Sequence, residues 1–190
     1  MDSGVLDKRL AFIEQVESLK STMRTACSAT GRNESTAEHS WRLALMAMVY
    51  ADALDAVDPY KLLKMCIIHD LGEAVSGDVP ATRKTALPEY PQQERADVLA
   101  LVSYLDAKAA ADIIALYDEY EAGQTPEAKA AKALDRLETI LQHTQGSHQP
   151  AVKFDFNLIY GRNHTDHFPE LRYVRSLLDK RTLAIIASSE

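Results

Sequence analysis

A histidine and an aspartate, His69 and Asp70, follow directly on an apolar run of residues 65–68. Helical spacing predicts that this run is buried, and burying an aspartate without a partner costs free energy. Two interpretations account for the pair. The side chains either cap the end of a helix or bind one cation, which would remove the desolvation cost. Because the dipeptide is common by chance, the pair alone does not decide between them.

His39 lies in the helix that is predicted to precede this pair. Apolar side chains follow it on the same helical face, at Leu43, Met46 and Tyr50, and they indicate that the imidazole points inward. A single inward histidine is usually a hydrogen-bonded core residue. Two inward histidines on consecutive antiparallel helices can instead meet over one cavity, so His39 and His69 together favour a metal site.

Three further carboxylates are candidates for chemistry. Glu73 and Asp78 lie within nine residues of His69. Beside a metal, one carboxylate can orient or deprotonate a water molecule, and another can bind a substrate hydroxyl. The alternative is an acidic loop exposed to solvent. Asp135 lies off the apolar stripe that begins at Leu134 in its predicted helix, so periodicity alone predicts a surface position for it.

The elements that must position these residues are predicted to be helices. Alanine, leucine and charged residues dominate, and glycine and proline number only seven each, a balance that favours helix. Residues 35–38 match a capping box, and Asp58 followed by Pro59 is typical of a helix start. We expect helices over residues 5–20, 36–54, 59–71, 91–106, 108–122, 126–145, 151–161 and 168–188. Residues 21–34 should connect two helices, residues 72–89 should form an ordered loop that can include a short turn of helix, and no run of strand length stands out.

Length and composition limit the class of protein. The 190 residues predict one domain, 1–190, with one substantial core. A formal net charge of −7 and a pI near 5.4 argue against nucleic acid polymers as partners. Two cysteines, Cys27 and Cys66, make no disulfide framework and indicate reduced thiols in the cytoplasm. The chain shows no secretory leader and no apolar run near the roughly 20 residues that span a bilayer, so no membrane partner is expected.

The order of these histidines and aspartates resembles the HD-domain phosphohydrolase superfamily, and within it the 5′-deoxynucleotidase branch. Three stretches carry the resemblance: residues 38–40, 69–80 and 132–135. The middle stretch has the pattern HDxxExxxGDxP, which is specific. The similarity covers a motif-bearing core of about residues 19–145 and leaves residues 146–190 as a helical C-terminal tail.

The resemblance implies roles for individual residues. One divalent metal ion (Co, Mn, Mg, Zn, Fe or Ni) would be bound by four of them: His39, His69, Asp70 and Asp135. Glu73 would assist the nucleophilic water, Asp78 would contact the sugar 3′-hydroxyl and disfavour a ribose 2′-hydroxyl, and Arg24 would grip the phosphate. Without the resemblance, Arg24 would be a surface cation at the end of the first helix.

The resemblance also implies an all-α, compact bundle of about seven to nine helices, a homodimer, and hydrolysis of deoxynucleoside 5′-monophosphates to nucleoside and phosphate. Cyclic nucleotides, deoxynucleoside triphosphates and guanosine tetraphosphate are alternative substrates. A non-catalytic nucleotide-binding module is a rival of another class, and the presence of both Glu73 and Asp78 speaks against it. One departure concerns the base. Thr25 stands where bacterial members place a tryptophan, and the only tryptophan, Trp41, lies after His39.

Histidines late in the chain bear on the number of metal ions. Dinuclear members of the superfamily need additional histidines. The remaining histidines match no motif: His143, His148, His164 and His167. We therefore expect them at the surface, and one metal ion rather than two.

Overall fold

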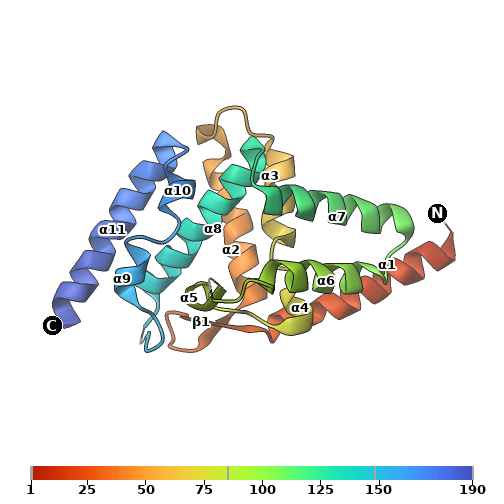
Figure 1. The fold of residues 1–190 in the computed structure, drawn as a ribbon, viewed down its shortest axis with the longest axis horizontal. Helices are drawn as coiled ribbons and strands as arrows, with labels where there is room; N and C mark the ends of the chain where they lie inside the picture. The colour runs from red at the N-terminus through yellow and green to blue at the C-terminus, as the bar shows by residue number, and fades with distance from the viewer. Residues whose placement is uncertain (1, 85, 148, 190) are drawn as a thin grey trace.

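Helix α8 (Pro126–Gln145) runs through the middle of the molecule, and other long helices pack around it (Figure 1). It contacts helices α2, α3, α7 and α11 and strand β1. The structure is a computed structural model that describes residues 2–84, 86–147 and 149–189. Because α8 is surrounded by other elements, it is buried on more of its circumference than a surface helix.

The described residues form seven helices of ten residues or more, four single helical turns and one pair of short strands. The long helices besides α8 are α1 (Ser3–Val16), α2 (Thr36–Tyr50), α3 (Pro59–Ile68), α6 (Tyr90–Val102), α7 (Ala107–Ala122) and α11 (Pro169–Ser189). The single turns are α4 (Glu73–Ser76), α5 (Ala81–Lys84), α9 (Phe154–Asn157) and α10 (Arg162–Thr165), and two 3₁₀ helices are η1 (Glu17–Lys20) and η2 (Ala51–Ala53). The predicted all-helical class is confirmed.

Side-chain caps fix the helix starts that position the site. At the start of α2, the Ser35 hydroxyl accepts from the Glu38 amide at 3.2 Å, and the Glu38 carboxylate accepts from the Ser35 amide at 2.9 Å. At the start of α3, Asp58 accepts from the amide of Tyr60 at 2.9 Å, with Pro59 in the first turn. Both predicted starts are therefore confirmed, and each satisfies amides that lack a partner within the helix.

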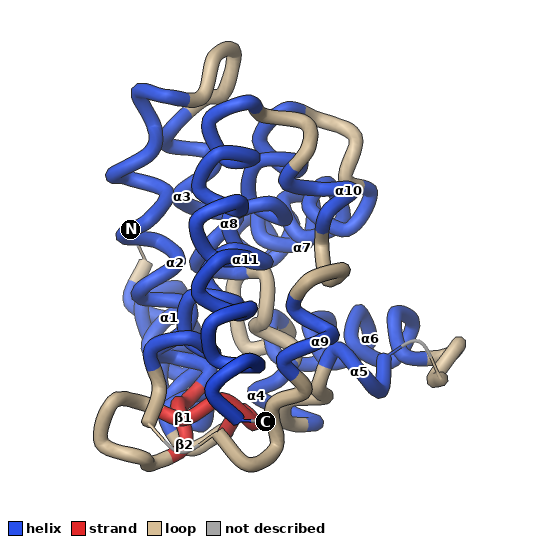
Figure 2. Tube along the Cα trace, turned by 90° about the vertical axis from the view of Figure 1, so that its left-hand side faces the viewer, coloured by secondary structure: helices blue, strands red, loops and turns tan. Residues whose placement is uncertain are grey.

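Residues 21–34, expected to be a connecting segment, include one strand and most of a second, so that expectation was wrong. Strand β1 (Met23–Cys27) pairs with β2 (Asn33–Ser35) in antiparallel fashion, with an irregularity between the paired ends. Figure 2 shows the two strands at one end of the molecule. The strands are too short and too irregular to show clear alternation in the sequence, and they are stabilised by pairing with each other and by contact of β1 with α8.

The single helix expected over residues 151–161 was also wrong. The structure has the turn α9 and then the turn α10, separated by residues 158–161. Gly161 between them has φ +69°, a left-handed conformation that ends regular helix and favours glycine. The last predicted helix is confirmed as α11.

Two apolar clusters form the core. The larger lies between α2, α3, α8 and α11 and includes Leu43, Leu62, Leu134 and Leu171, each fully buried. The smaller joins α1, α6 and α7 to the end of α3. The first cluster holds together the helices that carry the candidate metal ligands.

Two further expectations concern the cysteines and the membrane. Cys27 and Cys66 are both buried, and neither forms a disulfide. Among the residues that the structure describes, no helix has both the length and the apolar character needed to cross a bilayer.

Candidate functional site

The structure brings the four predicted metal ligands together. His39 comes from α2, His69 and Asp70 follow α3, and Asp135 comes from α8. His39 Nε2 lies 3.3 Å from His69 Nε2, 3.7 Å from Asp70 Oδ2 and 3.2 Å from Asp135 Oδ1. His69 Nε2 lies 3.0 Å from Asp70 Oδ2. All four side chains are buried, and none is more than 8% exposed.

Hydrogen bonds at the other ring nitrogens orient both imidazoles. His69 Nδ1 lies 3.0 Å from the Cys66 carbonyl oxygen, an acceptor, and so carries the proton. His39 Nδ1 contacts the carboxylate of Glu138, which is fully buried and also accepts from Arg42 Nε at 2.6 Å. The Nε2 atoms of the two rings face Asp135 and Asp70, and they are the ring atoms that can bind a metal ion. Two imidazole nitrogens and two carboxylates form a donor set that fits one divalent metal ion.

Asp135 shows why periodicity failed at this position. Its side chain is only 4% exposed, so the surface position predicted from the helical pattern was wrong. Because α8 lies at the centre of the molecule, residues off its main apolar stripe are also enclosed. Burial would raise the pKa of Asp135, but Arg136 and a hydrogen bond from His39 outweigh it and hold that pKa well below its usual value.

Glu73 lies beside these residues with one carboxylate oxygen unused. It is 2% exposed, and its Oε2 accepts from the Thr36 hydroxyl at 2.8 Å. Its Oε1 is buried and has no hydrogen-bond partner among the described residues. Burial and the charges of Asp70 and Asp78 raise the pKa of Glu73 to about 9. A buried carboxylate oxygen without a partner is costly and is suited to bind a water molecule.

Arg24 and Asp78 face the same region from different elements. Arg24, on β1, donates to Asp70 at 3.4 Å and to the Thr139 hydroxyl at 3.3 Å. Burial lowers the pKa of Arg24, but Asp70 and Asp78 raise it above the ordinary value, so the guanidinium stays charged. Asp78 is half-buried and follows Gly77, whose φ of +83° turns the chain toward the site. Arg24 is therefore not the exposed cation of the alternative interpretation.

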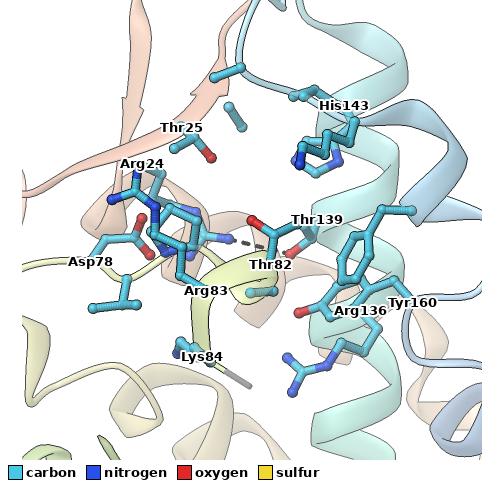
Figure 3. Close-up of a pocket in the computed structure, with 18 of the residues that line it drawn as sticks. Arg24, Thr25, Asp78, Thr82, Arg83, Lys84, Arg136, Thr139, His143 and Tyr160 are labelled. Carbon is cyan, nitrogen blue, oxygen red and sulfur yellow. Dashed lines mark hydrogen bonds between the residues drawn. The ribbon is translucent and has the colours of Figure 1, made fainter. Parts of the chain in front are cut away.

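These residues line a cavity of about 330 Å³. Figure 3 shows Arg24 and Asp78 on one side and Arg136 and Tyr160 on the other. Its lining also includes Asp70, Glu73 and Asp135, so two of the four candidate metal ligands, Asp70 and Asp135, open onto it. Trp41 is 67% exposed on α2 and does not line this cavity, whereas Thr25 does.

Sequence reasoning missed several residues of the site. Lys84 and Arg136 add positive charge to the lining, and Phe156 and Tyr160 add aromatic rings. Lys84 lies six residues after Asp78, and Arg136 directly follows a predicted ligand. Their closeness to the motif in the sequence could have indicated both residues. The two aromatic residues had no such signal, because they come from the C-terminal tail.

The predicted surface position was wrong for one of the later histidines. His143 is half-buried, lines the cavity and contacts Asn157 Oδ1 at 2.8 Å through Nδ1. Burial lowers its pKa. His167 is exposed as expected, His164 is partly buried, and His148 lies outside the described residues.

The fold brings two histidines and two aspartates together beside one cavity, which is the arrangement of a helical metal-binding enzyme. Comparison of the sequence with known families agrees with this class. Residues 16–172 match the HD domain, and the chain belongs to this family. It is 29% identical over 191 residues to the 5′-deoxynucleotidase HDDC2 of Danio rerio, a match that covers 97% of this chain and 94% of the relative. It is 31% identical over 149 residues to the 5′-deoxynucleotidase HDDC2 of Dictyostelium discoideum, covering 74% and 78% of the two chains.

A solved structure shows the same fold. It is the crystal structure of a protein from Magnetospirillum magnetotacticum described as a "Predicted metal-dependent phosphohydrolase". The two chains are 28% identical, the TM-score is 0.80, and the match covers 94% of this chain and 95% of the other. The likeness therefore extends over nearly the whole fold, including most of the C-terminal tail.

Proposed function

We propose that this chain is a metal-dependent phosphohydrolase that cleaves deoxynucleoside 5′-monophosphates to deoxynucleoside and phosphate. The observation that carries the proposal is the convergence of four buried ligand side chains, two of which, Asp70 and Asp135, line a cavity together with Glu73, Asp78 and Arg24. Relatives named 5′-deoxynucleotidase, matched over most of their length, support the substrate class.

Four residues would hold one divalent ion: His39, His69, Asp70 and Asp135. Cobalt, manganese, magnesium, zinc, iron and nickel are the candidates, and the mixed nitrogen and oxygen donors favour the transition metals over magnesium. When bound, such an ion polarises a phosphoryl oxygen and lowers the pKa of water. The protein's own contribution is to fix the donors in place, through Glu138 at His39 and the Cys66 carbonyl at His69.

The surrounding side chains would bind and orient the attacking water and the phosphate. The charge of a bound cation would oppose the charges of Asp70 and Asp78 and lower the pKa of Glu73, so that its carboxylate would be ionised. Glu73 Oε1 would then accept a hydrogen bond and a proton from the attacking water, while the Thr36 hydroxyl donates to Oε2. Arg24 would donate to the phosphate in place of its long contacts to Asp70 and Thr139.

Replacing Arg24 by alanine should leave metal content unchanged, since a phosphate-binding guanidinium does not ligate the ion. It should lower kcat/KM for dAMP by about ten- to a hundredfold, the effect of one charged hydrogen bond. Steady-state kinetics and metal analysis of the same preparation measure both. Arg95→Ala, which removes an exposed arginine paired with Asp118, is the matched control. Wild-type kinetics in Arg24→Ala would move phosphate binding to another cation such as Lys84 or Lys132.

Asp78 should make the protein prefer dAMP to AMP. The carboxylate would approach the sugar 3′-hydroxyl, and a 2′-hydroxyl would crowd that approach. Phosphate release from the two nucleotides at equal concentration measures the preference, and Asp78→Asn should reduce it. Equal rates on dAMP and AMP in the wild type would leave a phosphohydrolase but remove the preference for deoxynucleotides.

A substrate panel tests the proposed function against its rivals. It comprises deoxynucleoside 5′-monophosphates, the matching ribonucleotides, cyclic AMP, dATP and guanosine tetraphosphate, each assayed with added Co²⁺ or Mn²⁺. The proposal expects the fastest phosphate release from the deoxynucleoside monophosphates. Faster cleavage of another phosphoester would replace the substrate, and binding without cleavage of any would identify a non-catalytic module.

Assembly and location extend the proposal. A homodimer is supported by exposed apolar side chains on one helix, α2: Trp41, Leu45, Met48 and Val49. The mass of the protein in solution would test it.

Free, buried cysteines support a reducing compartment such as the cytoplasm, which fractionation would test. One domain spanning residues 1–190, with a nucleotide rather than a nucleic acid polymer or a membrane as partner, completes the proposal.

A further inference from the structure

The cavity has two walls of different chemistry. One wall is polar and carries Arg24, Asp78 and the candidate metal ligand Asp70. The opposite wall comes from the C-terminal tail and carries Phe156 and Tyr160. Figure 3 shows Tyr160 across the cavity from Arg24. These two rings stack on each other, with centroids 5.0 Å apart and planes at 30°. Both side chains are only partly buried, so they present ring surface to the cavity.

Buried contacts hold the aromatic wall in place. Arg175 of α11 is 1% exposed, and its guanidinium donates to the carbonyl oxygens of Asn157 at 2.5 Å and Tyr160 at 2.6 Å. Asn157 is fully buried and contacts His143 of α8. A Cβ on Gly161 would lie 2.4 Å from the Arg136 side chain, so glycine lets the chain pass closely over α8. The wall is therefore a preformed surface.

Arg136 connects this wall to the metal centre. Its guanidinium lies 5.0 Å from the centre of the Tyr160 ring, and it pairs with the carboxylate of Asp135. The aromatic wall thus lies one side chain away from a candidate metal ligand. A molecule with its phosphate at Arg24 and its sugar at Asp78 would have its remaining part free to reach the opposite wall.

We propose that Phe156 and Tyr160 form the nucleobase-binding surface of the cavity, where a planar heteroaromatic base stacks on the ring pair. The inference rests on the proposed function, because it assigns the part of the nucleotide that the phosphate and sugar contacts leave open. Thr25 offers no ring at its position, and Trp41 does not line the cavity. Since every base has a π face, stacking tolerates different bases. We therefore expect little selectivity among the four deoxynucleotides.

The test compares a substrate that has a base with one that lacks it. We would measure kcat/KM for dAMP and for 2-deoxyribose 5-phosphate in the wild type, Tyr160→Leu and Phe156→Leu. Loss of stacking should reduce the dAMP value by about tenfold in each leucine variant and leave the value for the sugar phosphate unchanged. Tyr160→Phe keeps the ring and should retain the wild-type value. Tyr173→Leu, which removes a tyrosine 67% exposed on α11, is the matched control.

A binding measurement separates failure of this inference from failure of the proposed function. Calorimetric Kd values for dAMP and 2-deoxyribose 5-phosphate need no turnover, so they test the wall even if the wild type hydrolyses neither compound. The inference expects the Kd for dAMP alone to rise in the leucine variants. Equal losses for both ligands would show that the rings only support the fold. Unchanged values for both would show that the base binds elsewhere, and either result overturns the inference.

Discussion

Asp135→Ala should lose metal binding and activity while keeping a helical fold. Removing hydrogen-bond partners of metal ligands already costs about ten- to a hundredfold in affinity or activity, so removing a ligand itself should cost about a hundredfold or more. Titration calorimetry with Co²⁺ or Mn²⁺ measures the affinity, and circular dichroism monitors the fold. Asp112→Ala, which removes an exposed aspartate paired with Lys108, is the control.

Among the four ligands, Asp135 gives the most discriminating test, because helical periodicity predicted a surface position for it and only the fold brings it to the site. Its carboxylate lies 3.2 Å from His39 Nε2. Wild-type metal affinity in Asp135→Ala, with the helical content retained, would contradict the four-residue site. Such a result would leave Asp135 as the buried partner of Arg136.

Glu73→Gln should separate chemistry from metal binding. The amide keeps the size of the side chain and can still contact Thr36, but it cannot accept a proton from water. We expect kcat for dAMP to fall by about 10²- to 10⁴-fold, the usual contribution of a general base, with metal affinity close to that of the wild type. Glu14→Gln changes an exposed glutamate on α1 and should have no effect.

Two outcomes would remove this role from Glu73. Turnover at the wild-type rate would show that proton transfer does not pass through its carboxylate. Loss of metal together with loss of turnover would place Glu73 among the ligands. The carboxylate oxygens of Glu73 and Asp70 lie close enough to share one ion, which would explain that result.

Local signals in the sequence predicted the helix starts and the two histidines. Caps such as Ser35 with Glu38 act over a few residues, so the sequence alone contains them. Asp135 was predicted through the resemblance and not through periodicity, because a pattern along one helix does not show how many neighbours enclose it. The strand β1 was missed because its pairing with β2 and its contact with α8 are tertiary.

The aromatic wall could not be predicted from local sequence either, because tertiary contacts position it. Phe156 and Tyr160 reach the cavity because Arg175, distant in sequence, holds the backbone of their segment. Glu138 is different. It lies three residues after Asp135 on the same helix and contacts His39, so helical spacing would have indicated it once Asp135 was placed.

A cobalt titration of chelator-stripped protein tests the central claim most directly. Phosphate release from dAMP would be followed as Co²⁺ is added in fractions of one equivalent per chain. We predict negligible release from the stripped protein and a rise that saturates at one equivalent, as expected for a single ion held by two histidines and two aspartates. Release that is undiminished by stripping, or that stays absent at every Co²⁺ and Mn²⁺ concentration, would contradict the account.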